Sequence, residues 1–221
     1  MTHTAIVLDT ETTDIDSPEV IELGWQTFGA AHESGEVRRY RPTKPPKWGA
    51  IATHHIFMSE LEGLPESTRA ARDLPPAEYW IGHNIDFDWK ALGCPPVKRI
   101  CTLALARELW PEVDSHSLVA LTYFTKGAHV ATRERVRNAH SALEDVWLCA
   151  ELLRTIMYVA KIDGLPALYA ASEEARIPKI MTFGKHKGKR VDEVDRGYAN
   201  WYRRQEDTDP YLLEAFRRAG L

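Results

Sequence analysis

The chain has 221 residues, 44% of them hydrophobic and 27% charged, and its mean hydropathy is −0.37. These values describe an ordinary globular protein, large enough for one domain of about 150 residues and an appendage. Three cysteines without a C-x-x-C pair argue against a disulfide framework and a zinc knuckle. The opening sequence MTHTAIVLDT has neither the basic segment nor the apolar run of a targeting signal, and no stretch reaches the length of a membrane span. We therefore expect a cytoplasmic protein without membrane contact.

The first third of the chain reads as a β-meander followed by the start of an α/β alternation. Apolar and β-branched residues predict three strands, after which a cluster of prolines ends the sheet. Ser59 with Glu62 three positions later has the spacing of a capping box and predicts the start of a helix. Further short apolar runs, each followed by a helical pattern, predict two more strands. The predicted strands are residues 4–9, 20–28, 36–41, 79–82 and 99–102.

The strongest helical periodicity spans residues 142–160, where apolar side chains recur every three or four positions. Ser141 and Glu144 form a second capping-box pattern, which makes Ser141 the predicted N-cap and places Asp145 in the first turn. The sequence DGLP ends this helix. We therefore predict one domain over residues 1–162 and a small module over residues 163–221.

Charge is distributed unevenly between the two predicted parts. Residues 1–175 contain 17 Lys and Arg against 25 Asp and Glu, whereas residues 176–221 contain 11 against 7. An acidic body with a basic tail makes an anionic partner plausible. This signal is weak by itself.

Asp9 and Glu11 stand two positions apart at the end of the first predicted strand. Side chains at this spacing lie on one face of a strand, where like charges repel unless a cation lies between them. Hard divalent cations prefer such oxygen ligands. The alternative is that the two acids simply begin a solvated loop, so D-x-E alone does not decide between them.

Two further stretches place histidine and acidic residues at the start of a predicted helix. One contains His83, Asn84 and Asp88, and the other contains His140 and Asp145. An acid on a rigid helix can hold a metal while an imidazole on the preceding loop approaches a water molecule. For His140 alone, a core or surface histidine is favoured over a catalytic one, and only the other motifs change that balance.

The order D-x-E, H-N-x-x-F-D and H-x-x-x-x-D resembles the three motifs of the DEDD exonuclease superfamily, in its histidine-containing, DnaQ-like branch. Residues 50–56, 100–111 and 182–194 also resemble a bacterial member with a basic extension. The resemblance implies a ribonuclease H-like mixed sheet flanked by helices, with a small basic C-terminal module. It implies Asp9, Glu11, Asp88 and Asp145 as metal ligands and His140 as general base. In the second motif, H-N-x-x-F-D, it assigns Asp88 rather than Asp86 as the ligand.

The same resemblance implies a 3′–5′ exodeoxyribonuclease that releases nucleoside 5′-monophosphates and serves in DNA repair. Two Mg²⁺ ions about 3.5–4 Å apart, replaceable by Mn²⁺, would activate water and stabilise the leaving oxygen. The expected partner is DNA with a 3′ end, single-stranded or duplex. An RNA-trimming nuclease, a proofreading subunit and a catalytically silent nucleic-acid-binding protein stay open as alternatives, as does the oligomeric state, a homodimer included.

Contacts with the nucleic acid are expected in two regions. Members of this superfamily often have glycine where this chain has Asp14, which leaves the details of 3′-end binding open. In the tail, glycines bracket a dense group of basic residues that can contact phosphates, while Tyr198, Trp201 and Tyr202 either stack on bases or form the inner face of a helix. The expected nucleic-acid-binding residues are Thr10, Thr12, Ile15, His54, Asn84, Lys185, Lys187, Lys189 and Arg190.

Overall fold

The computed structural model consists of two compact units, Met1–Ala170 and Ala171–Leu221. It describes residues 4–31, 34–137 and 141–221. Within these ranges, no helix is both long enough and apolar enough to cross a membrane.

A five-stranded mixed sheet forms the centre of the first unit, in the order β3-β2-β1-β4-β5. The central strand β1 pairs antiparallel with β2 and parallel with β4. All five predicted strands are confirmed, but β1 is longer than predicted because its pairing with β2 continues past Asp9 to Thr12. Asp9 and Glu11 therefore lie within the strand and not beyond its end. The strands are β1 Ala5–Thr12, β2 Val20–Thr27, β3 Glu36–Arg39, β4 Tyr79–Gly82 and β5 Lys98–Cys101.

The helix at residues 142–160 is confirmed with the predicted bounds, whereas the helix predicted from Ser59 is wrong. That segment forms only the 3-10 turn η1 (Met58–Glu60), whose N-cap N–H at Phe57 is accepted by Glu60 at 2.7 Å, and the chain leaves the helical conformation at Gly63, where φ is 77°. A second 3-10 turn, η2, spans Ser67–Arg69. The helices are α1 Trp48–His54, α2 Ala70–Asp73, α3 Ile85–Ala91, α4 Thr102–Leu109, α5 Leu118–Lys126, α6 Val130–Arg135, α7 Ala142–Ala160, α8 Leu165–Ala175, α9 Arg196–Tyr202 and α10 Pro210–Arg218.

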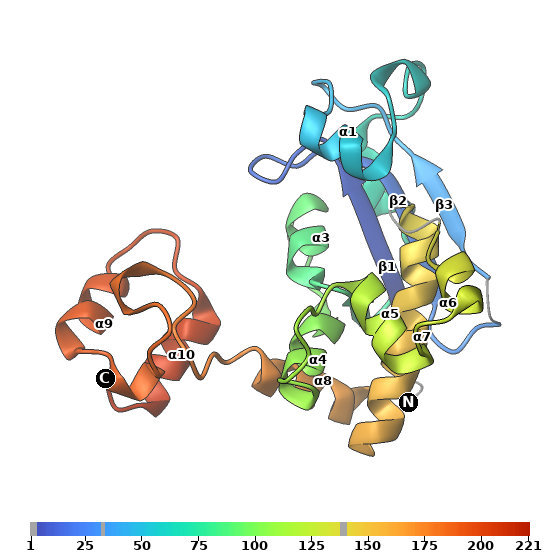
Figure 1. Cartoon of the computed structure of the whole chain (residues 1–221). Helices are drawn as coiled ribbons and strands as arrows, with labels where there is room; N and C mark the ends of the chain where they lie inside the picture. The colour runs from blue at the N-terminus through green and yellow to red at the C-terminus, as the bar shows by residue number, and fades with distance from the viewer. Residues whose placement is uncertain (1–3, 32–33, 138–140) are drawn as a thin grey trace. The chain divides into compact units, whose positions relative to one another are not determined.

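Helices cover the sheet of the first unit. The long helix α7 packs against β1 and β2, and α4 and α5 pack against α7, while α3 contacts β1, β4 and β5 (Figure 1). Along β1 the side chains alternate: Ile6 and Leu8 enter a buried cluster with Ile85 of α3, while Asp9 and Glu11 approach α7. This alternation places acidic groups between the central strand and the long helix.

The second unit has its own small core. Met181, Tyr198, Tyr202 and Phe216 are buried there between α9, α10 and the loop that the Ile180–Arg190 bridge closes. Of the two interpretations of the tail aromatics, core packing is confirmed for Tyr198 and Tyr202, while Trp201 is 52% exposed. The loop contains the 3-10 turns η3 Gly184–His186 and η4 Val191–Glu193.

Candidate active site

Three carboxylates from two elements meet above the centre of the sheet. Asp9 and Glu11 come from β1 and Asp145 from the first turn of α7. One oxygen from each lies within 4.8 Å of the others. Such a set of oxygen atoms fits a hard divalent cation.

A glycine on β2 lets α7 approach this closely. Gly24 lies opposite Asp9 in the β1–β2 register. A Cβ atom on Gly24 would lie 2.6 Å from the Ala142 carbonyl carbon and 2.7 Å from the Leu143 nitrogen. The absence of a side chain at Gly24 therefore permits the first turn of α7 to rest on β2, next to Asp9.

The N-terminus of α7 is capped by a residue far away in sequence. Ser141 occupies the predicted N-cap position, but its side chain makes no capping hydrogen bond. Glu144 pairs instead with Arg135 of α6 at 2.9 Å, so the reciprocal capping box predicted for Ser141 and Glu144 is wrong. The acceptor for the Ala142 N–H is the carboxylate of Glu22 on β2, at 3.1 Å. The signal for this residue was an acid inside the apolar strand sequence VIELGW.

Asp88 approaches the site along the open edge of β1. Strand β4 pairs only with residues 5–7 of β1, so the edge beyond is available to the helix that follows β4. There Thr10 donates from its backbone N–H (2.9 Å) and its hydroxyl (2.7 Å) to one oxygen of Asp88. Asp86, by contrast, is about one-third exposed and pairs with Arg99.

Burial and mutual repulsion raise the pKa values of the clustered carboxyl groups. The pKa of Asp9 is raised well above its usual value, first by burial and then by the neighbouring Asp88, Asp145, Glu11 and Glu22. Burial and the same kind of neighbours raise the pKa of Glu11 to about 9. Burial raises the pKa of Asp88 to about 7 despite the hydrogen bonds from Thr10. The cluster therefore resists full ionisation without a cation.

A cavity of about 530 Å³ lies beside the cluster, within the size range of small-molecule sites. Of the predicted nucleic-acid-binding residues, Thr10, Thr12, Ile15 and His54 line it. Asn84 is not among its lining residues; it is exposed at the N-cap of α3 with a left-handed backbone (φ 73°). Five further residues line the cavity but were not assigned to it from the sequence: Lys47, Gly49, Ala50, Thr53 and Phe87. Phe87 belongs to the H-N-x-x-F-D motif and Ala50 and Thr53 to the resembling stretch 50–56, whereas Lys47 and Gly49 follow no motif.

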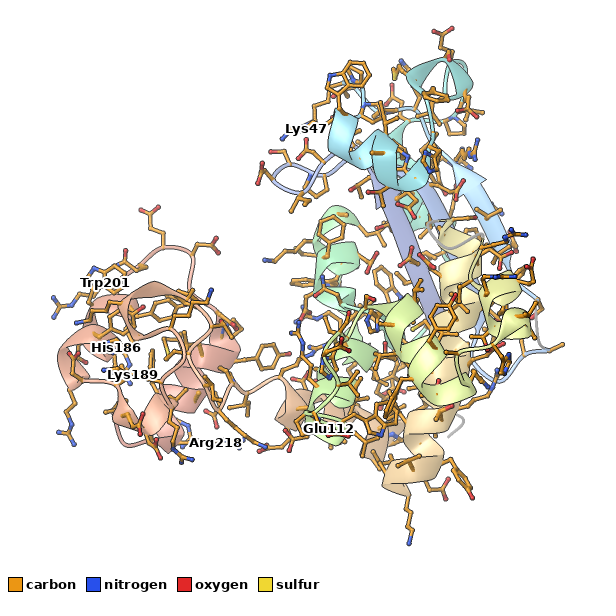
Figure 2. The ribbon with its side chains drawn as sticks, in the orientation of Figure 1. Lys47, Glu112, His186, Lys189, Trp201 and Arg218 are labelled. Carbon is orange, nitrogen blue, oxygen red and sulfur yellow. The ribbon has the colours of Figure 1, made fainter. Side chains whose placement is uncertain are left out.

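The rim of the cavity contains a loop held by Asp14. The Asp14 carboxylate accepts the Ser17 N–H at 2.6 Å and pairs with Lys44 at 3.0 Å. Lys47, labelled in Figure 2 next to α1, lies 3.8 Å from the same carboxylate. Ile15 next to it is 82% exposed. Asp14 thus ties down the loop and presents Ile15 to solvent at the cavity.

Two predicted site residues need separate mention. His140, the expected general base, lies outside the described residues. His54 is buried at the wall of the cavity, where its Nδ1 accepts the Ile56 N–H at 2.9 Å, and burial lowers its pKa. His54 is therefore held rigidly, in its neutral form near neutral pH.

The four basic residues predicted to contact nucleic acid in the tail differ in their surroundings. Lys185 pairs with Asp195 at 3.2 Å, and Arg190 pairs with Asp192 at 2.7 Å. In the part of the chain that the structure describes, the side chains of Lys187 and Lys189 have no hydrogen bond or ion pair. The positive charge available to a ligand is therefore smaller than the sequence count suggests.

Comparison with known proteins identifies the family. No family model matches the chain, but it is 33% identical over 172 residues to exodeoxyribonuclease 10 of Escherichia coli K12, and the match covers 73% of each chain. The structure matches exonuclease X solved in complex with 5′ overhanging duplex DNA, with a TM-score of 0.63, 25% identity and coverage of 76% of this chain and 99% of the other.

A second solved structure shares the fold. It is the zinc-bound form of E. coli exonuclease I with single-stranded DNA, at a TM-score of 0.59 and 18% identity, and the match covers 81% of this chain and 44% of that one. The mixed sheet with its flanking helices is thus the ribonuclease H-like fold of these exonucleases, as the sequence motifs implied. The chain belongs to the exodeoxyribonuclease X family of DEDD exonucleases.

Proposed function

We propose that this chain is a metal-dependent 3′–5′ exodeoxyribonuclease that shortens DNA from its 3′ end and releases nucleoside 5′-monophosphates. The observation that carries the proposal is the convergence of Asp9, Glu11 and Asp145 within 4.8 Å, in a member of an exodeoxyribonuclease family. A catalytically silent binding protein would have no need for such mutually repelling buried acids.

The acidic cluster fits divalent metal ions. Burial and like-charge repulsion raise the pKa values of Asp9 and Glu11, and a cation between the carboxylates would relieve both costs. We assign Asp9, Glu11, Asp88 and Asp145 as the residues that would hold two Mg²⁺ ions, for which Mn²⁺ can substitute because both ions prefer oxygen ligands. When bound, such ions supply activation of water and charge stabilisation for the leaving oxygen.

Two further tasks, the orientation of a ligand and the removal of a proton, are assigned to side chains of the protein. Thr10 holds Asp88 with two hydrogen bonds, which fixes the direction of that carboxylate. His140 is assigned as the general base that removes a proton from the attacking water, since an imidazole with an ordinary pKa of about 6.5 can accept a proton near neutral pH. Its position five residues before Asp145 supports this role.

The cavity beside the cluster is the proposed position of the 3′-terminal nucleotide. Its volume of about 530 Å³ suits a nucleotide, and Glu11 lies in its wall. The exposed Ile15 offers an apolar surface to a base, Lys47 at the N-cap of α1 offers a positive charge, and the buried His54 forms part of the wall. These contacts would position the last phosphodiester bond next to the carboxylates.

Digestion of a 5′-labelled oligonucleotide tests the proposal directly. We expect a ladder that shortens from the 3′ end in Mg²⁺, no cleavage in EDTA, and no cleavage by Asp9→Asn in either buffer. Parallel single-stranded, duplex, mismatched and RNA substrates decide between DNA degradation, proofreading and RNA trimming. Metal-independent cleavage, or normal activity of Asp9→Asn, would refute the assignment.

We further propose that residues 171–221 add a second contact with DNA. Lys187 and Lys189 flank Gly188, whose positive φ of 86° forms the turn that carries them. Trp201 is 52% exposed and packs against Tyr198, with a ring-centroid distance of 5.2 Å. Figure 2 shows Trp201, His186 and Lys189 on this unit. Lysines for phosphates and an exposed indole for base stacking are the usual elements of single-strand binding.

The expected cellular setting follows from the cysteines and the reaction. Cys94, Cys101 and Cys149 are all free, which agrees with a reducing compartment. We propose the cytoplasm as the site of action and DNA repair as the process.

A further inference from the structure

A row of three charged side chains crosses the sheet next to the acidic cluster. Glu11 on β1 lies opposite Glu22 on β2, and Glu22 lies opposite Arg39 on β3. Residues directly opposite each other in antiparallel strands point to the same face. This row therefore points to the face that carries Asp9 and the N-terminus of α7.

Both oxygens of Glu22 are engaged. Oε2 accepts a hydrogen bond from Nε of Arg39 at 2.7 Å, and Oε1 accepts the backbone N–H of Ala142 at 3.1 Å. The residue is only 4% exposed. It also lies outside the group of Asp9, Glu11 and Asp145 whose oxygens converge. Glu22 is thus placed to hold a helix and not to bind the metal ions.

The held helix is the one that carries a proposed metal ligand. Ala142 is the first residue of α7, and Asp145 lies three positions later, on the same side of the helix. A carboxylate at this end also interacts favourably with the partial positive charge of the helix N-terminus. Gly24 allows contact but has no side chain that could form a hydrogen bond. Glu22 supplies that bond from the sheet, while Glu144 ties the same turn to Arg135 of α6.

We propose that Glu22 is a positioning residue, which holds the first turn of α7 through Ala142 and so keeps Asp145 at the distance from Asp9 and Glu11 that metal binding needs. Arg39 has the supporting role of orienting Glu22 and neutralising its charge opposite Glu11. The inference rests on the proposed metal site and names one residue that the binding of metal at that site requires.

Two conservative substitutions separate the effect of the length of the Glu22 side chain from the effect of its charge. Glu22→Gln keeps the side-chain length and a carbonyl oxygen that can accept the Ala142 N–H, but it removes the charge. Glu22→Asp keeps the charge but shortens the side chain by one methylene, so it no longer reaches Ala142. Glu60→Gln is the matched control, because Glu60 also pairs with Arg39, at 3.3 Å, yet belongs to η1 and not to the acidic cluster.

The first measurement is calorimetric titration of the full-length proteins with Mn²⁺ alone. We expect Glu22→Asp to bind Mn²⁺ about 10–100-fold more weakly, the usual cost of losing a group that orients a ligand. We expect Glu22→Gln to stay within about threefold of the original protein, and Glu60→Gln to be unchanged. The second measurement is the kinetics of DNA cleavage at saturating metal, where kcat should fall in Glu22→Asp with little change in KM.

The outcomes distinguish this inference from the proposed function. If the unaltered protein shows no metal-dependent cleavage, the proposed function fails. If the unaltered protein cleaves DNA but Glu22→Asp binds Mn²⁺ and turns over normally, the positioning role is refuted. Equal loss of Mn²⁺ affinity in Glu22→Gln and Glu22→Asp would also refute it. The charge of Glu22, and not the length of its side chain, would then be responsible for the loss.

Discussion

Removing one acid from the cluster should stabilise the metal-free protein while it destroys the proposed metal site. Glu11→Gln keeps the shape of the side chain but removes the group whose pKa is raised to about 9, mainly by burial and then by Asp145. Because the folded protein keeps this proton when the unfolded chain has lost it, the free energy of unfolding falls as pH rises from about 4.5 to about 9.

The size of the effect follows from this pKa difference. A pH of 7.5 lies about three units above the ordinary pKa of Glu11 in the unfolded chain. At about 1.4 kcal/mol per unit, keeping Glu11 protonated in the folded protein therefore costs at most about 4 kcal/mol of unfolding free energy. Since the neighbouring acids share the repulsion, we expect Glu11→Gln to raise the free energy of unfolding by about 1–4 kcal/mol at pH 7.5. For a protein of this size, at about 2–4 °C per kcal/mol, that gain corresponds to an increase in Tm of about 2–16 °C.

Thermal unfolding followed by circular dichroism in EDTA, at several pH values between 5 and 8, measures the difference. The Tm advantage of Glu11→Gln should be small at pH 5 and grow with pH. Added Mg²⁺ should raise the Tm of the unaltered protein and leave that of Glu11→Gln nearly unchanged. Glu60→Gln, which changes a more exposed glutamate, serves as the control. A lower Tm for Glu11→Gln at pH 8 in EDTA, or an advantage that shrinks with pH, would refute the reasoning.

Three further predictions concern catalysis and binding. Asp88→Asn should abolish Mg²⁺-dependent cleavage while Asp86→Asn keeps most of it, since a partly exposed ion pair contributes little to stability; cleavage rates and circular dichroism check both. His140→Ala should lower kcat far more than it changes KM and remove the acidic limb of the pH–rate profile; an unchanged limb would exclude this base. Changing Lys187 and Lys189 together to Gln should weaken DNA binding and flatten the slope of log K against log salt by about 1.4 for a single strand, with kcat within a few-fold; an unchanged slope in a binding titration would refute the second contact.

Local sequence patterns were sufficient for the five strands and for the long helix α7. Apolar runs predicted all five strands, and helical periodicity with a serine N-cap predicted both ends of α7. These features depend on neighbouring residues, whose propensities act over a few positions. The prediction from local pattern failed at Ser59, where the chain forms only a short 3-10 turn and then turns at Gly63 with a positive φ of 77°.

Side-chain partners in the tail could not be read from composition. The sequence shows an excess of basic residues after position 175, but Asp195 and Asp192 pair with Lys185 and Arg190 in the folded unit. Only folding decides which charges neutralise one another, because pairing depends on distances of a few ångströms between turns.

The sequence predicted one part of the candidate site, and the tertiary structure decided the other. The motifs named Asp9, Glu11 and Asp145 and indicated that acids on one face of a strand call for a cation. Only the tertiary structure decided that a glycine at position 24 lets α7 rest on β2 and that Glu22, 120 positions away in sequence, caps Ala142. The reason is physical: a strand and a helix each determine the direction of their own side chains, whereas the distance between them depends on packing across the sheet, which no local pattern encodes.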